Sequence, residues 1–157
     1  MCGICGEFKF KEIPFNDKKL SNLMNSISNR GRDSNGTFKN IEIFLGHHRL
    51  SIIDTSDKSN QPMVIENYVI VFNGIIYNYK DIRKKLIDLG HTFKSTGDTE
   101  VIIRSYIEYG DRCVDYFDGV FSFCIYNPLT KNIFLARDRI GIKPLYYSIN
   151  DNEFVFS

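Results

Sequence analysis

The order in which strand-like and helix-like apolar patterns follow one another constrains this chain most. Strand-like runs dominate both ends of the sequence and helical spacing dominates the middle, without the regular strand–helix alternation of a parallel sheet. This order predicts an α+β fold with largely antiparallel sheets. The length of 157 residues suits one domain with a substantial core.

The individual elements follow from local patterns. Leu20, Leu23, Met24 and Ile27 recur at helical spacing, and Gly31 ends that helix. Further helices are expected over residues 78–89, 97–110 and 111–117. Strands are expected over residues 3–10, 41–54, 68–74, 119–127, 133–138, 145–149 and 153–157, with a hairpin turn at 128–132.

Charge and hydropathy exclude several classes of function. Lys plus Arg total 20 and Asp plus Glu total 19, and the most basic cluster, residues 80–85, is interspersed with apolar residues like a solvated helix face. This balance argues against nucleic-acid binding. No apolar run approaches the roughly 18 residues that a membrane span needs, and the N-terminus lacks the pattern of a signal peptide. We therefore expect a cytoplasmic protein that binds no membrane.

Two cysteines stand three apart in the opening stretch MCGICGEF, so a zinc or redox CxxC pair has to be considered. A structural zinc site needs four ligands, and no second CxxC is present. A redox CxxC begins a helix, whereas this segment is strand-like, so that Cys2 and Cys5 would point to opposite faces. We expect no metal site and free thiols, with Cys113 and Cys124 as packing residues in apolar runs.

The position of Cys2 suggests a third interpretation. Removal of Met1 would give Cys2 a free α-amino group beside its own thiol. The amine has a typical pKa of about 7.7–8.0 and the thiol one of about 8.5, so the amine can accept the thiol proton near neutral pH. One residue would then supply both nucleophile and base.

A thiol that attacks an amide needs an oxyanion site and groups that hold the substrate. The Asn73 side chain and the Gly74 N–H, at the end of a buried strand, could converge on one oxygen, although Asn-Gly is also a common turn. Arg49 suits a carboxylate. Asp98 precedes a predicted helix, where it or Thr99 could serve as the N-cap.

Eight motifs follow one another along the chain: MCGICGEF, NRGRDSNG, LGHHRLSIID, NQPM, VFNGIIYNY, GDTEVII, FDGVFSFCIYN and ARDRIGIKPLYY. Taken together, these motifs resemble the glutaminase domain of glutamine-hydrolysing asparagine synthetases. This family belongs to the class II glutamine amidotransferases, within the N-terminal nucleophile hydrolases. The resemblance covers nearly the whole chain and keeps the order of its motifs.

The resemblance implies a four-layer αββα sandwich and assigns roles to single positions. Cys2 would be the nucleophile, and Asn73 with the Gly74 amide would form the oxyanion hole. Arg49 would hold the α-carboxylate of glutamine and Asp98 its α-ammonium group. Further contacts to the substrate are implied for Leu50, Ser51, Ile52 and Ile53, and a supporting role beside the site for Arg30 and Asp33.

The implied reaction releases glutamate and ammonia from L-glutamine through a γ-glutamyl thioester on Cys2, without a metal or cofactor. In the family the ammonia passes to an ATP-dependent synthetase domain, for which ATP and Mg²⁺ are expected. No Walker-type or SGGxDS loop occurs in the sequence. Residues 1–157 are therefore expected to be the N-terminal glutaminase part of a longer protein. A homodimer is compatible with the sequence, which does not determine the oligomeric state.

Two positions depart from the family pattern. Ile75 stands where the family usually has Glu, and Arg32 where it usually has Pro. Ile75 removes a carboxylate from the ammonium end of the substrate site. These departures leave two alternatives open: a specialised amidotransferase that acts on a sugar or natural-product carboxylate, or a degenerate glutamine-binding module with weak or no turnover.

Overall fold

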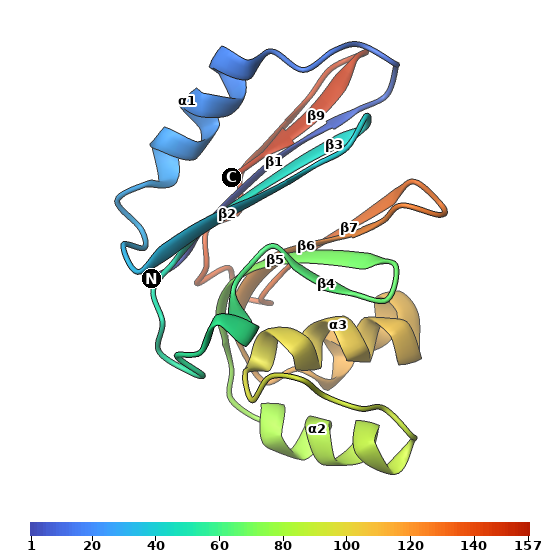
Figure 1. Cartoon of the computed structure of the whole chain (residues 1–157). Coiled ribbons are helices and arrows are strands. Elements are labelled where there is room, and N and C mark those ends of the chain that lie inside the picture. The colour runs from blue at the N-terminus through green and yellow to red at the C-terminus, as the bar shows by residue number, and fades with distance from the viewer.

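The computed structural model describes residues 1–157 as two antiparallel β-sheets that face each other, with helices on both outer faces (Figure 1). The first sheet has the strand order β2-β3-β1-β9-β8 and the second the order β4-β5-β6-β7. The strands are β1 (Gly3–Lys9), β2 (Ser34–Lys39), β3 (Ile43–Arg49), β4 (Met63–Ile65), β5 (Tyr68–Ile76), β6 (Gly119–Asn127), β7 (Asn132–Arg137), β8 (Tyr147–Ile149) and β9 (Glu153–Phe156).

Three α-helices form the outer layers. Helix α1 (Asp17–Ile27) lies on the first sheet, α3 (Asp98–Tyr109) lies on the second, and α2 (Tyr79–Asp88) packs against α3 (Figure 1). Two 3₁₀ segments, η1 (Asp57–Ser59) and η2 (Gly110–Tyr116), complete the regular structure. The layers are thus helix, sheet, sheet and helix, which confirms the expected αββα sandwich.

Apolar side chains fill each interface between layers. The space between the sheets contains residues from both ends of the chain, such as Ile4 and Phe156, together with Val71 and Tyr126 from the second sheet. Helices α2 and α3 bury a larger cluster against the other face of β5 and β6. Because β1 pairs with both β3 and β9, the N-terminal strand lies in the middle of its sheet.

The structure differs from the sequence-based expectation in a few elements. Strands β2 and β4 were not expected, because SNGTFK is largely polar and MVI is only three residues long. The segment after α3 is a 3₁₀ helix. Helix α3 begins at Asp98 with Gly97 as its N-cap and has no side-chain capping bond, so neither Asp98 nor Thr99 acts as the N-cap. None of the helices is long and apolar enough to span a membrane.

Candidate functional site

A cavity of about 170 Å³ lies where the N-terminus, the end of β3, the end of β5 and the start of α3 meet. It brings together residues that are far apart in the sequence, which is what the ordered motifs predicted. Its lining includes Met1, Cys2, Arg49, Leu50, Ile52, Ile53, Ser59, Gln61, Phe72, Asn73, Gly74, Ile75, Gly97, Asp98, Thr99 and Lys143.

Cys2 lies directly before β1 and lines the cavity. The Leu50 N–H donates a hydrogen bond to Cys2 Sγ at 3.4 Å. Burial raises the pKa of the Cys2 thiol, and this is partly offset by the Leu50 hydrogen bond, the N-terminal charge and Arg49. The pKa of the Cys2 thiol therefore depends on the Leu50 N–H and on the positive groups near it.

Cys5 is not a partner of Cys2. Its Sγ lies 3.9 Å from Met24 Sδ, under helix α1, and its side chain is fully buried. Burial raises the pKa of the Cys5 thiol to about 12, which makes it unreactive. All four cysteines are free, and no cluster of three or more His, Cys, Asp or Glu side chains could hold a metal.

Asn73 and Gly74 lie in β5, opposite Ser122 and Phe121 of β6. A Cβ at Gly74 would lie 2.2 Å from the Val120 carbonyl oxygen, so only glycine fits between these strands. Asn73 is buried and lines the cavity beside Cys2. The Asn-Gly pair is therefore part of a paired strand, and its turn interpretation is wrong.

Arg49 is a buried cation at the end of β3. Its Nη1 donates to the Ser56 carbonyl at 3.0 Å and to Asn60 Oδ1 at 2.8 Å, and its Nη2 donates to the Asp54 carbonyl. These bonds order the segment 50–60 around the guanidinium. They leave two of its five N–H groups without a partner, and Arg49 lines the cavity.

Asp98 is buried at the first position of α3. Its Oδ2 accepts the Ile76 N–H at 3.1 Å, which ties the helix to the end of β5. Burial raises the pKa of the Asp98 carboxyl, and backbone hydrogen bonds only partly oppose this. Asp98 is the one carboxylate among the cavity-lining residues, so it is the only anionic partner that the cavity offers to a cation.

Two carboxylates that do not line the cavity, those of Asp33 and Asp54, hold the segment of residues 50–60 in place. Asp33 Oδ2 accepts the Ser51 N–H at 2.7 Å, and Asp54 Oδ2 accepts the Thr96 N–H at 2.6 Å. Arg30 donates from Nε to the Cys2 carbonyl at 3.4 Å. Arg30, Asp33 and Ser51 therefore do not line the cavity but contact the segments that do.

Gln61 is a site residue that the sequence did not single out. Its Oε1 accepts the Phe72 N–H at 2.6 Å and its Nε2 donates to Thr99 Oγ1 at 3.2 Å. It thereby joins the residue before Asn73 to the residue after Asp98. The motif NQPM contained this signal, but only the fold shows which strand and helix it connects.

The chain is similar to known proteins over its whole length. A model of the glutamine amidotransferase domain matches residues 1–157. Asparagine synthetase (glutamine-hydrolysing) 3 of Bacillus subtilis is 37% identical over 99% of this chain and 26% of its own length. A putative asparagine synthetase of Methanocaldococcus jannaschii is 38% identical over 100% of this chain and 34% of its own length. The chain therefore spans about a quarter to a third of these relatives.

A solved structure shares the fold at low sequence identity. Glutamine phosphoribosylpyrophosphate amidotransferase of Bacillus subtilis matches with a TM-score of 0.74 and 18% identity, over 98% of this chain and 41% of that one. At this identity the match supports the architecture alone, and it agrees with the two facing antiparallel sheets.

Proposed function

This chain belongs to the glutamine amidotransferase domain family, and we propose that it hydrolyses L-glutamine at Cys2 through a γ-glutamyl thioester. One observation carries the proposal. Cys2, Asn73 and Gly74 line one cavity together with a buried cation, Arg49, and a buried carboxylate, Asp98. That set matches an amide group attached to an amino acid zwitterion.

The substrate is held by its charged end. The two free N–H groups of Arg49 can bind the α-carboxylate as a fork, and Asp98 can accept the α-ammonium group. Leu50, Ile52 and Ile53 cover the aliphatic part of the side chain from the 50–53 segment. The carboxamide then extends toward the Cys2 thiol.

The chemical steps follow from these positions. The Cys2 sulfur forms a bond to the amide carbon, and the oxyanion accepts hydrogen bonds from the Asn73 side chain and the Gly74 N–H. The α-amine of Cys2 takes the thiol proton and delivers it to the leaving nitrogen, so that ammonia departs. Water then attacks the thioester, which releases glutamate and restores the thiol.

Removal of Met1 is part of this proposal. Met1 lines the cavity, and Lys143 Nζ lies 3.2 Å from Met1 Sδ, so the retained methionine occupies space beside the nucleophile. With Met1 present, the α-amine belongs to another residue and cannot act as the base of Cys2. We expect activity only in the form of the protein that begins at Cys2.

The test is glutamate release from glutamine, with the N-terminus checked by mass spectrometry. Cys2→Ala should abolish turnover, while Cys5→Ala, which changes a buried thiol of similar sequence context, should leave it within a few-fold of the parent. An electrophilic glutamine analogue such as diazo-oxo-norleucine should label Cys2 once. Glutamate release by the Cys2→Ala variant at the parent rate would refute the proposal.

The alternative function, a glutamine-binding module without turnover, rests on the apolar Ile75 in the same lining as the single carboxylate Asp98, and the similarity to glutamine-hydrolysing asparagine synthetases does not favour it. Calorimetric titration with glutamine of the form that begins at Cys2 distinguishes the binding module from the enzyme. Binding without release of glutamate would identify a binding module. Turnover that disappears in Cys2→Ala, while glutamine binding persists, would identify the enzyme.

We further propose that the released ammonia serves a synthetase-type domain, because the related asparagine synthetases are three to four times longer than this chain. ATP and Mg²⁺ would belong to that domain and not to residues 1–157. The cytoplasm is the proposed compartment, and the acceptor is a carboxylate, either aspartate or another acid.

A further inference from the structure

The connection between the two sheets ends in two consecutive amide side chains, those of Asn60 and Gln61. The segment of residues 50–62 leads from β3 in the first sheet to β4 in the second (Figure 1). Gln61 is buried and lines the glutamine cavity, but its amide oxygen and its amide nitrogen both bond to the protein. Gln61 therefore links protein segments inside the site.

The oxygen of the Gln61 amide takes the place of a missing bond between strands. The register of β4 with β5 pairs Met63 with Ile70. Continued by two residues, the same register places Gln61 opposite Phe72. β4 begins only at Met63, and the Phe72 N–H donates instead to Gln61 Oε1 at 2.6 Å. Because an unpaired buried N–H is costly, this bond fixes the position of β5 directly before Asn73.

The nitrogen of the same amide reaches the helix that carries Asp98. Gln61 Nε2 donates to Thr99 Oγ1 at 3.2 Å, and Thr99 is the second residue of α3. Asp98, the first residue of the helix, accepts the Ile76 N–H at the other end of the same stretch of β5, at 3.1 Å. Two links therefore join β5 to the start of α3, one on each side of the proposed oxyanion hole.

The neighbouring residue bonds to the cation of the site. Asn60 Oδ1 accepts a hydrogen bond from Arg49 Nη1 at 2.8 Å. The backbone beside it is also held in place, because the Gln61 carbonyl oxygen lies against Gly36 of β2, where a Cβ would come within 2.3 Å of it. Two consecutive residues therefore bond to the strand of the proposed oxyanion hole, to the helix of Asp98 and to Arg49.

We propose that Gln61 is a positioning residue that fixes the distance between the oxyanion hole and the groups that bind the charged end of the substrate, so that the site selects glutamine over the shorter amide asparagine. This inference rests on the proposed function, which supplies both ends of the site. A substrate bound at both ends is selected by its length only if the two ends of the site cannot move independently. Asparagine is one methylene shorter, and a displacement of about 1 Å at the reacting carbon can cost about a hundredfold in rate.

The test compares glutamine with asparagine as substrates of the form that begins at Cys2, measured by the release of ammonia. The main variant is Gln61→Met, which keeps the length of the side chain but neither of its polar ends. Thr99→Val removes only the bond to α3, and Thr99→Ser, which keeps a hydroxyl, is its conservative counterpart. The matched control is Asn40→Leu, which removes an amide that accepts the N–H of the first residue of β3 at 2.9 Å, at the end of that strand remote from the cavity.

We expect the parent and the control to prefer glutamine over asparagine by about a hundredfold or more in kcat/KM, and Gln61→Met to reduce this preference about tenfold or more. The loss should lie mainly in kcat for glutamine. Its KM should change less than about threefold, because Arg49 and Asp98 still bind the charged end. Thr99→Val should change the preference and kcat in the same direction, and Thr99→Ser should return both toward the parent values.

An unchanged preference in Gln61→Met or in Thr99→Val would overturn the positioning role. An equal loss of preference in Asn40→Leu would also overturn it, because the loss would then follow from lower stability of the fold in general. Circular dichroism establishes that each variant is folded. If Gln61→Met does not fold, the comparison of Thr99→Val with Thr99→Ser decides the outcome.

Labelling of Cys2 separates this inference from the proposed function. Diazo-oxo-norleucine has the length of glutamine and diazo-oxo-norvaline that of asparagine, and alkylation of the thiol needs no turnover. A parent that releases no glutamate but is labelled faster by the longer reagent would refute the proposed function, and loss of that difference in Gln61→Met would still support the positioning role. Glutamate release by the parent, with an undiminished labelling preference in Gln61→Met, would leave the function in place and overturn the positioning role.

Discussion

At the scale of single residues, the end of the cavity proposed to hold the α-ammonium group is where the site departs from the family pattern. Asp98 is the only carboxylate there, and Ile75 contributes an apolar side chain to the same lining. One of the two oxygens of Asp98 already accepts a hydrogen bond within the protein, because Oδ2 accepts the Ile76 N–H at 3.1 Å. In the proposed complex, Asp98 alone would therefore hold the α-ammonium group of glutamine, with a carboxyl whose pKa is raised by burial.

Ile75→Glu should strengthen glutamine binding, because it adds a second anionic acceptor for the α-ammonium group. A charge-assisted hydrogen bond contributes about 1.5–3 kcal/mol, so KM should fall roughly tenfold or more. The measurement is steady-state glutamate release as a function of glutamine concentration. Ile75→Gln, which adds an uncharged polar group of the same size, is the control, and an unchanged KM in Ile75→Glu would contradict this account.

Asp98→Asn should stabilise the fold at pH 7 and impair glutamine binding. The raised pKa means that folding favours the protonated carboxyl, so stability from this group is present at low pH and is lost as pH rises through the folded pKa. Asn keeps an oxygen that can accept the Ile76 N–H but carries no charge. The increase in Tm should therefore be largest near neutral pH and should vanish in acid, whereas a uniform decrease in Tm would contradict it.

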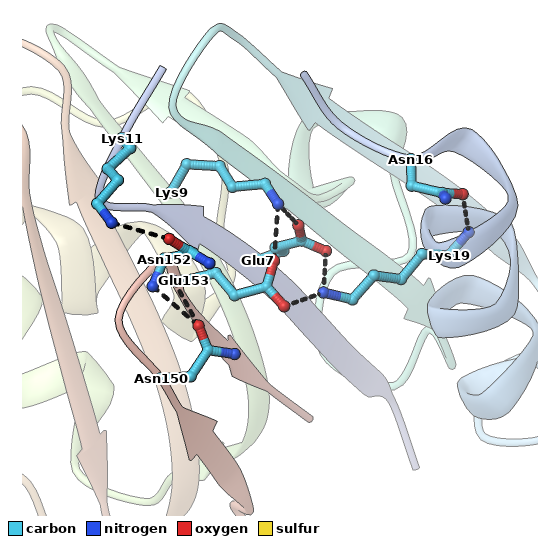
Figure 2. A network of polar contacts seen from close by, with 8 residues as sticks. All are labelled: Glu7, Lys9, Lys11, Asn16, Lys19, Asn150, Asn152 and Glu153. Carbon is cyan, nitrogen blue, oxygen red and sulfur yellow. Dashed lines mark hydrogen bonds and ion pairs between the residues drawn. The ribbon is translucent and has the colours of Figure 1, made fainter. Parts of the chain in front are cut away.

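At the scale of elements, a closed set of ion pairs joins α1 to the centre of the first sheet (Figure 2). Lys9 Nζ lies 2.7 Å from Glu7 Oε1 and 2.7 Å from Glu153 Oε2, and Lys19 Nζ lies 3.1 Å from Glu7 Oε2 and 2.5 Å from Glu153 Oε1. The set connects β1, α1 and β9.

Glu7→Ala should lower the free energy of unfolding by about 3 kcal/mol, because it leaves the buried Lys9 with a single partner. Urea unfolding monitored by circular dichroism measures the change. Asp115→Ala, which removes an exposed ion pair with Arg112, is the control and should cost less than about 1 kcal/mol. If both substitutions changed the free energy of unfolding equally, burial would not make the ion pairs of Glu7 more stabilising than an exposed pair.

The same ion pairs predict a pH dependence in strong acid. The two lysines lower the pKa of Glu153 from 4.5 to about 2. A carboxyl with a lowered folded pKa contributes stability above its ordinary pKa and loses it as pH falls through the folded value. The stability that depends on Glu153 should therefore disappear between about pH 4.5 and pH 2.

At the scale of the whole molecule, His47 connects the two sheets. It lies in β3, is fully buried, and its Nε2 lies 3.3 Å from the Phe72 carbonyl of β5, which precedes Asn73. Its Nδ1 has no partner. Burial lowers the pKa of His47 from 6.5 to about 4, with Arg49 and His48 adding positive charge nearby.

Protonation of His47 in acid should therefore lower the free energy of unfolding. The unfolded chain binds a proton near pH 6.5 and the folded chain only near pH 4, so stability falls across this range, by up to about 3 kcal/mol. Urea midpoints measured between pH 7 and pH 4 should show this decrease. His47→Gln, which keeps an N–H donor for the Phe72 carbonyl, should abolish it, whereas His48→Gln should retain it.

The sequence by itself determined much of the fold and most of the candidate residues. Apolar periodicity located α1, α2 and α3, and the ordered motifs identified Cys2, Arg49, Asn73, Gly74 and Asp98 before the structure placed them around one cavity. The helix predictions depend on local spacing, which can be read from neighbouring positions in the chain. The site residues follow from residue chemistry and from the resemblance to the glutaminase domain of asparagine synthetases.

The tertiary structure alone decided which distant segments meet. Polar β2 and short β4 form only because a neighbouring strand supplies their hydrogen bonds. Gln61 became a site residue because the fold brings Phe72 and Thr99 to its two ends. Burial and long-range pairing set these outcomes, and neither is encoded by any single stretch of sequence.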